Sequence, residues 1–210
     1  MLRIHTNANS AVAKSYFSSA DYYSEGQELL GVWHGKGAAR LGLRGEVNEK
    51  DWDRLCDNLD PSSGKPLTIR RKLDRRVGYD FTFDVPKSVS LLYGLTGDER
   101  VLDAFRSSVD ATMHEIEAEA QARVRINGMN EDRTTGNLVW GQYVHFTSRP
   151  VDGVPDPQLH AHCFVFNATF DPNESRWKAA QIGSIKRDAP YFQASFDARL
   201  ARNLNELGLP

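Results

Sequence analysis

One short apolar run constrains the fold of this chain more than any other feature. The run LHAHCFVF, Leu159 to Phe166, has the composition of a buried β-strand, yet it contains His160 and His162. Side chains alternate between the two faces of a strand, so residues two apart project side by side. We therefore expect two imidazoles on one face, either as a hydrogen-bonded core pair or as half of a metal site.

A third histidine lies in the preceding strand candidate, NLVWGQYVHFTS. If the two strands pair antiparallel, His145 comes opposite His160 and His162, with cross-strand Cβ atoms about 5 Å apart. Gly141 on the same face would leave room for a group to approach the sheet. Three imidazoles meeting there would bind a divalent metal and leave coordination positions open, as catalytic sites do. The alternative for His145 is an ordinary strand histidine.

A second alternating segment, GYDFTFD, predicts a half-buried strand. Its aromatic residues occupy one face, and Asp80 lies on the other. In a sheet with the two histidine strands, Asp80 could orient a ring or accept a proton. An exposed aspartate is the alternative. The other histidines, His5, His34 and His114, have no partner at ligand spacing, and we interpret them as structural or exposed.

The remaining pattern predicts an α+β fold with a largely antiparallel sheet and helices packed on one side of it. LRIHT is predicted to form a short opening strand, and the Gly-rich residues 31–43 are predicted to form a loop or an irregular turn. Helices are expected from a Ser10 cap through Val12, Tyr16, Ala20 and Tyr23, from an Asn48 cap to Pro61, over 98–127, and over 184–207.

Composition narrows the partners only slightly. The 210 residues carry a net charge of −2, so bulk charge does not predict nucleic-acid binding. No run is long and apolar enough for a membrane span, and the N-terminus lacks a signal-peptide layout, so we expect the cytoplasm. Cys56 and Cys163 fall in apolar patterns and are expected to be reduced structural thiols.

Basic residues concentrate in one segment, KPLTIRRKLDRR, where they could neutralise phosphates locally or form a solvated face. The candidates for contact with a DNA backbone are Lys65, Arg70, Arg71, Lys72, Arg75 and Arg76. Trp33 is a candidate for base stacking, with packing in the core as the alternative.

Together these motifs resemble the MobF class of conjugative plasmid relaxases, the TrwC/TraI-like HUH endonucleases. HFTSRPVDGVPDPQLHAHCFVFN resembles the three-histidine motif, and GYDFTFDVPKSVS resembles the segment with the active-site aspartate, here Asp80. WHGKGAARLGL resembles the loop after the catalytic tyrosines. The resemblance implies a palm-like, RRM-like sheet with flanking helices, and a relaxase domain over residues 1–210 that is truncated at its C-terminal end.

The implied activity is strand-specific DNA nicking at an origin of transfer. A tyrosine attacks the scissile phosphate and forms a 5′-phosphotyrosyl adduct. Tyr16 matches the first nucleophile, while Phe17 replaces the second member of that pair and cannot attack. Tyr22 and Tyr23 match the pair of the second transfer, and which of them acts is open. The rivals are a replication-type HUH nickase, a metal-containing DNA-binding module without catalysis, and a metal hydrolase of small phosphoesters.

The resemblance also implies a cofactor and partners. One divalent ion, Mg²⁺ or Mn²⁺ in use with Zn²⁺ or Ni²⁺ as alternatives, would be held by the three histidines and would stabilise charge on the phosphate. The partners would be single-stranded DNA with a hairpin at the origin of transfer, relaxosome accessory proteins and a type IV coupling protein. The protein would act in the bacterial cytoplasm and could pass with the DNA into a recipient cell.

Overall fold

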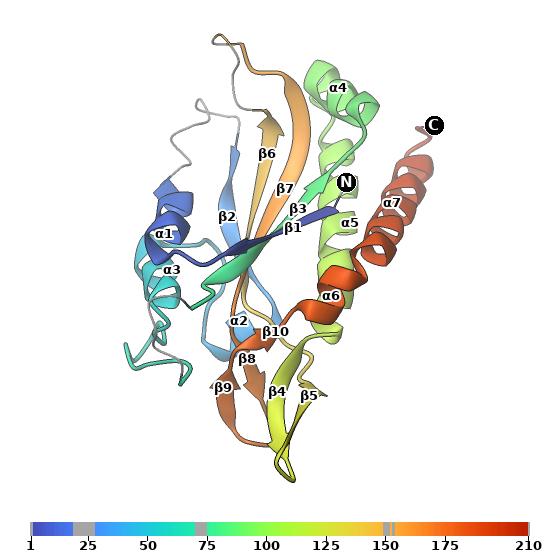
Figure 1. The fold of residues 1–210 in the computed structure, drawn as a ribbon. Coiled ribbons are helices and arrows are strands. Elements are labelled where there is room, and N and C mark those ends of the chain that lie inside the picture. The colour runs from blue at the N-terminus through green and yellow to red at the C-terminus, as the bar shows by residue number, and fades with distance from the viewer. Residues whose placement is uncertain (1, 19–27, 70–74, 149–151, 153, 210) are drawn as a thin grey trace.

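A five-stranded antiparallel sheet forms the centre of the molecule. The computed structural model describes residues 2–18, 28–69, 75–148, 152 and 154–209; the side chains of 16–18 and 28–30 lie outside the described part. The strands lie in the order β1-β3-β7-β6-β2 (Figure 1). Their bounds are Leu2–Asn7 for β1, Gly78–Asp84 for β3, Pro157–Phe166 for β7, Trp140–Thr147 for β6 and Glu28–His34 for β2. The predicted α+β class with a central antiparallel sheet is confirmed.

One face of the sheet is covered along its length by long helices. The aromatic side chains Tyr79, Phe81 and Phe83 of β3 point to this face, as their alternation predicted, and all three are buried. They pack with apolar residues of α5 (Glu99–Ala118) and α7 (Ala189–Glu206), such as Phe105 and Phe196. Helix α4 (Lys87–Thr96) lies beside the two, next to β7.

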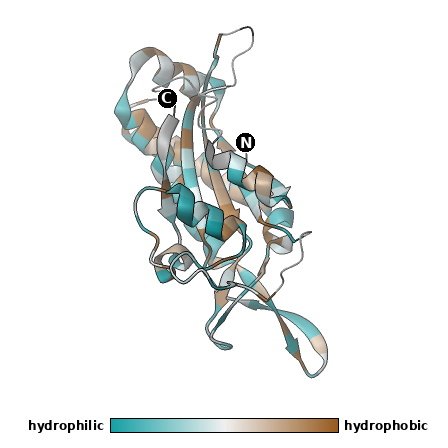
Figure 2. Cartoon of the chain, turned by 90° about the vertical axis from the view of Figure 1, so that its left-hand side faces the viewer, coloured by the Kyte–Doolittle hydropathy of each residue, from teal (hydrophilic) through white to brown (hydrophobic). Residues whose placement is uncertain are grey.

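The other face is covered only in part, by α1 (Ser10–Ser18) and α3 (Glu49–Cys56). The expectation of helices on one side alone is therefore wrong. Trp52 of α3 is fully buried, and its ring lies 5.0–5.2 Å from those of Phe164 and Phe166 on β7. Its indole Nε1 donates to the carbonyl of Ala13 at 2.9 Å, which attaches α1 to α3. Figure 2 shows this side of the molecule, with apolar colour along strands behind the helices.

Gly141 makes room for this aromatic cluster. A Cβ atom at position 141 would lie 2.9 Å from the ring of Trp52, closer than side chains normally approach. The space beside Gly141, predicted to admit a ligand, is thus occupied by the indole of Trp52. Trp33 belongs to the same cluster and is only 6% exposed.

The start of α1 differs from the prediction because a neighbouring residue caps it. The Asn9 side chain accepts hydrogen bonds from the amides of Ala11 and Val12, so Asn9, not Ser10, is the cap. Among the side chains of this helix that the structure describes, those of residues 10–15, Ala13 is buried, while Val12 is 55% exposed. The predicted continuation of the apolar stripe through Ala20 and Tyr23 lies outside the described residues.

Residues 31–43 are not a loop. They form the end of β2 and a short helix, α2 (Lys36–Arg40), because the edge of β6 offers pairing groups that a local pattern does not reveal. The predicted start of the next helix at Asn48 is confirmed, and this cap accepts from the Asp51 amide at 3.0 Å, but the helix ends at Cys56, before Pro61.

The long helix predicted over 98–127 ends at Ala118. A hairpin of β4 (Gln121–Ile126) and β5 (Met129–Thr134) follows, turning at Asn127 and Gly128, both of which have positive φ. The last predicted helix is divided into α6 (Gly183–Arg187) and α7, at Asp188 just before Pro190. Short strands complete this end of the molecule: β8 (Thr169–Asp171), β9 (Arg176–Lys178) and β10 (Ala180–Gln181).

Both cysteines are buried free thiols, as predicted. Burial raises the pKa of Cys56 to about 12 and that of Cys163 well above its usual value, so neither supplies a thiolate nucleophile. Within the described part of the chain, none of the helices combines the length and apolar character needed to cross a membrane.

We predict that Trp52→Ala lowers the free energy of unfolding by about 3–5 kcal/mol, because it opens a cavity between α3 and the sheet. Urea denaturation followed by circular dichroism measures the change. Leu95→Ala is the control, since Leu95 is 84% exposed and its loss should change stability by less than about 0.5 kcal/mol. Equal effects of the two substitutions would contradict the role given to the aromatic cluster.

Candidate active site

Three histidine side chains gather on the part of the sheet that α1 and α3 leave open. His145 on β6 is the cross-strand partner of His160 on β7, and His162 follows two residues later on the same face. The ring centroids of His145 lie 5.0 Å from His160 and 5.3 Å from His162, and those of His160 and His162 are 5.2 Å apart. The three rings therefore meet on one face of the sheet, as the sequence predicted.

These separations suit a shared ion. A histidine nitrogen lies about 2.0–2.1 Å from bound Zn²⁺, which places the centroids of three rings around one tetrahedral ion roughly 5 Å apart. The chemistry of the donor set fits as well, because imidazole is a preferred ligand for divalent transition metals. Among the residues that the structure describes, however, no three His, Cys, Asp or Glu side chains already form a metal-binding group. Coordination by these histidines stays a prediction.

Neighbouring acceptors orient two of the rings. His162 Nδ1 lies 2.8 Å from a carboxylate oxygen of Asp80, and His160 Nδ1 lies 2.8 Å from the carbonyl of Gln158. With a proton on Nδ1, each ring donates to its acceptor and keeps Nε2 as the metal-binding nitrogen. Thr82 places its hydroxyl 3.3 Å from the same Nδ1 of His162. The contact of Asp80 with the histidine cluster, expected from its place on β3, is present.

Their surroundings keep two of these histidines, His145 and His160, neutral. Burial, followed by the neighbouring rings of His160 and His162, lowers the pKa of His145 to about 3. Burial also lowers the pKa of His160. Neutral imidazole is the form that binds metals, so the low values leave both rings ready to coordinate at neutral pH.

A cavity of about 420 Å³ opens over two of the rings. It is lined by Arg3, His5, Asp80, Thr82, Ser148, Gln158, His160 and His162. Arg3 and His5 were not predicted as site residues, although β1 alternates Leu2 and Ile4 inward with these two outward. His5 is exposed, as expected, but it lies directly opposite Asp80 in the register of β1 and β3. Only the sheet order reveals that β1 adjoins the site.

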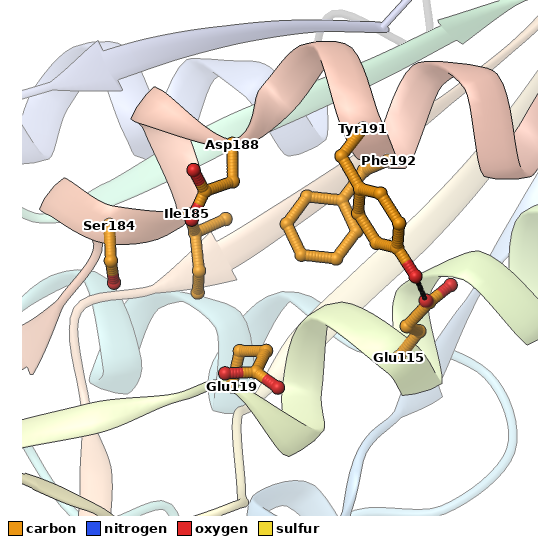
Figure 3. A pocket seen from close by; sticks show the side chains of 7 residues that line it. All are labelled: Glu115, Glu119, Ser184, Ile185, Asp188, Tyr191 and Phe192. Atoms are coloured by element: carbon orange, nitrogen blue, oxygen red, sulfur yellow. Dashed lines mark hydrogen bonds between the residues drawn. The ribbon is translucent and has the colours of Figure 1, made fainter.

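None of the described phenols lines this cavity, although Tyr143 lies on the same sheet face as the cross-strand partner of His162. Tyr79 and Tyr143 are buried in the two cores, and Tyr93 packs on Phe146. Tyr191 lines a separate cavity of about 380 Å³ between α5, α6 and α7, where it donates to Glu115 at 2.6 Å (Figure 3). That hydrogen bond raises the pKa of Tyr191, which makes it a poor nucleophile.

The candidate nucleophiles therefore remain Tyr16, Tyr22 and Tyr23. Tyr22 and Tyr23 lie outside the described residues, as does the side chain of Tyr16. The backbone of Tyr16 belongs to α1, which packs on the same sheet face as the three imidazoles.

Comparison with known proteins identifies the family. The family model described as TrwC relaxase matches residues 6–210. The chain belongs to the TrwC relaxase family. A multifunctional conjugation protein TraI of Escherichia coli is 38% identical over 182 residues, which cover 83% of this chain and 10% of that protein. The chain thus spans about a tenth of the length of this relative.

Solved relaxase structures share the fold of this chain over nearly its full length. The metal-bound structure of the conjugative relaxase TrwC in complex with oriT DNA has a TM-score of 0.84 at 34% identity and covers 99% of this chain and 71% of that one. TrwC complexed with a 27-mer DNA comprising the recognition hairpin and the cleavage site gives 0.83 at 34% identity, covering 99% and 70%. A copper-bound TrwC complex with oriT DNA gives 0.85 at 35% identity, covering 99% and 71%.

Where the structure describes it, the basic segment of the chain lies apart from the histidine cavity. Arg75 and Arg76 line another cavity, of about 410 Å³, together with Arg123. Arg75 also donates to the carbonyl of Cys56, and Lys65 is exposed. Arg70, Arg71 and Lys72 lie outside the described residues. Trp33 is buried against Trp52 and Phe166, so the packed alternative holds and base stacking by Trp33 is not supported.

We predict that the metal-free protein loses stability as the pH falls below about 6.5. The unfolded chain then protonates its histidines, while buried His145, with a folded pKa of about 3, stays neutral. From these values, the loss due to His145 between pH 7 and pH 5 is roughly 2 kcal/mol. Urea unfolding in EDTA at both pH values measures it. His145→Asn should show a smaller loss, and an unchanged one would rule out this linkage.

Proposed function

We propose that residues 1–210 form the DNA-nicking domain of a conjugative relaxase, which cuts one strand at an origin of transfer by transesterification. The observation that carries the proposal is the set of three imidazoles on the open end of the sheet, two of them oriented through Nδ1. The family match and the TrwC complexes with oriT DNA support the choice of substrate.

The proposed reaction needs a phenol, a proton acceptor and stabilisation of charge on the phosphate. The Tyr16 oxygen attacks the scissile phosphorus, the new phosphotyrosyl bond forms, and the bond to the 3′-oxygen breaks. The phenol loses its proton and the leaving 3′-oxygen gains one. Because one phosphodiester bond replaces another, no external energy source is required. Asp80 accepts from His162 in the structure, which favours an orienting role over that of proton acceptor.

His145, His160 and His162 would hold one divalent ion. When bound, it supplies positive charge for the non-bridging phosphate oxygens. We propose Mg²⁺ or Mn²⁺ as the ion in use. Zn²⁺ and Ni²⁺ are the alternatives, because imidazole ligands bind them more readily than Mg²⁺. The relatives with bound ions include a copper complex of TrwC.

The substrate is proposed to be single-stranded DNA with an adjacent hairpin, the kind of DNA in the TrwC 27-mer complex. By family resemblance, Tyr22 or Tyr23 carries the second transfer, since Phe17 has no hydroxyl. Relaxosome accessory proteins and a type IV coupling protein are the proposed partners. The protein is proposed to act in the bacterial cytoplasm and to enter the recipient cell with the DNA.

We predict that Tyr16→Phe abolishes the covalent adduct with a single-stranded oligonucleotide from the transfer origin, because the attacking oxygen is removed. The adduct is detected as a shifted band on a denaturing gel, with Mn²⁺ or Mg²⁺ present. Tyr191→Phe is the matched control and should form the adduct at the wild-type rate. An adduct formed at full rate by Tyr16→Phe would overturn the assignment. If the wild type binds DNA but never forms the adduct, a non-catalytic binding module is favoured.

We also predict that His160→Ala and His162→Ala each lower the bound metal at least ten-fold, because each removes one of three ligands. Elemental analysis after dialysis against Mn²⁺ or Zn²⁺ measures the content. His114→Ala is the control, since His114 lies on α5 at the opposite face and is exposed. Unchanged metal in the first two variants would indicate a core histidine pair instead.

A further inference from the structure

The open end of the sheet carries a charged residue that the proposed reaction has not used. Arg3 of β1 lines the same cavity as Asp80, His160 and His162. It is the cross-strand partner of Thr82, and its side chain is 48% exposed. Two strand spacings, about 10 Å, separate its backbone from that of β7. An arginine side chain can cover much of that distance, so its guanidinium can reach a group bound over the histidines.

A hydrogen bond to Asp84 holds the guanidinium of Arg3 in place. Its Nη2 donates to Asp84 at 2.6 Å, and the other oxygen of Asp84 accepts from Gln158 at 2.9 Å. The carboxylate is mostly covered, with 13% of its side chain exposed, whereas the guanidinium is not. Arginine has five N–H donors in a planar fork, so a single bond to Asp84 leaves others available for a ligand. Because about half of the Arg3 side chain is exposed, solvent screens this pair and it adds little to the stability of the fold.

The negative charge around the cavity calls for a cation where DNA binds, and Arg3 supplies one. Asp80 and Asp84 are both negative, and a DNA strand brings a phosphate for every nucleotide. A divalent ion at the histidines offsets the charge at one phosphate. Arg3 offsets Asp84 and offers a permanent cation for a second phosphate, in the bidentate geometry that guanidinium and phosphate share.

We propose that Arg3 binds the phosphate next to the scissile one and thereby fixes the position of the strand over the histidines. The inference rests on the proposed nicking function and adds a phosphate-binding residue on β1 to it. Arg3 is a substrate-binding residue in this scheme, and Asp84 positions it.

The test compares Arg3→Gln with Arg3→Lys and with Arg100→Gln, which removes a guanidinium from another exposed arginine–aspartate pair, on α5. Binding of single-stranded oligonucleotides tiled across the transfer origin is measured by fluorescence anisotropy in EDTA, over a range of salt concentrations. We expect Arg3→Gln to weaken binding about ten-fold and to lower the slope of log affinity against log salt by about 0.7, the value for one phosphate contact in single strands. Arg3→Lys should keep the slope, and Arg100→Gln should change neither quantity.

A second measurement locates the phosphate. Neutral methylphosphonates replace single phosphates around the nick site, and one of them should weaken binding by the wild type but not by Arg3→Gln. Equal penalties in both proteins, or an affinity and slope of Arg3→Gln like those of Arg100→Gln, overturn the inference. If the wild type binds the oligonucleotides but does not cut them, the nicking function is contradicted and the Arg3 contact is not. The salt slope then still shows whether Arg3 binds a phosphate. If the wild type binds none of the oligonucleotides, both the nicking function and the Arg3 contact are contradicted.

Discussion

The register between β6 and β7 decides whether this molecule has a site at all. His145 and His160 face one another across the two strands, and His162 follows on the same side. A slip of one residue would turn both β7 histidines into the apolar core beneath α5 and α7 and bring Ala161 and Cys163 to the open face. The apolar residues that alternate with the histidines exclude that slip, because Leu159, Ala161, Cys163 and Val165 are all buried on the helix-covered side. The core therefore fixes the position of the rings.

The sheet face that carries the site is divided into an apolar half and a polar half. Aromatic residues gather under α1 and α3, and the charged and imidazole groups lie beyond them. The first half fastens the helix that bears Tyr16 through the bond from Trp52 to Ala13. The second stays accessible, so a substrate strand can approach while the adjoining cluster holds the sheet rigid.

Sequence alone predicted the strands with the histidines and Asp80, because each has a strong local alternation and the pairing follows from a short connection. It did not predict β2 or the hairpin of β4 and β5. Residues 31–34 begin a Gly-rich stretch and are extended through their pairing with β6, and residues 121–126 continue a helical stripe until the turn at Asn127. Gly141 was misread for a related reason, since a partner from a distant helix fills the space beside it. Arg3 was missed because strand order is a property of the whole chain.

The place of β1 at the edge of the sheet has a practical consequence. Arg3 and His5 line the histidine cavity from the first few positions of the chain, and the amide of Leu2 is bound to the side chain of Gln193 on α7. Any peptide fused ahead of residue 1 therefore begins within a few residues of the imidazole cluster. A polyhistidine purification tag at that end would bring foreign metal ligands to the cavity, whereas a cleavable tag without histidine keeps metal analysis of this protein interpretable.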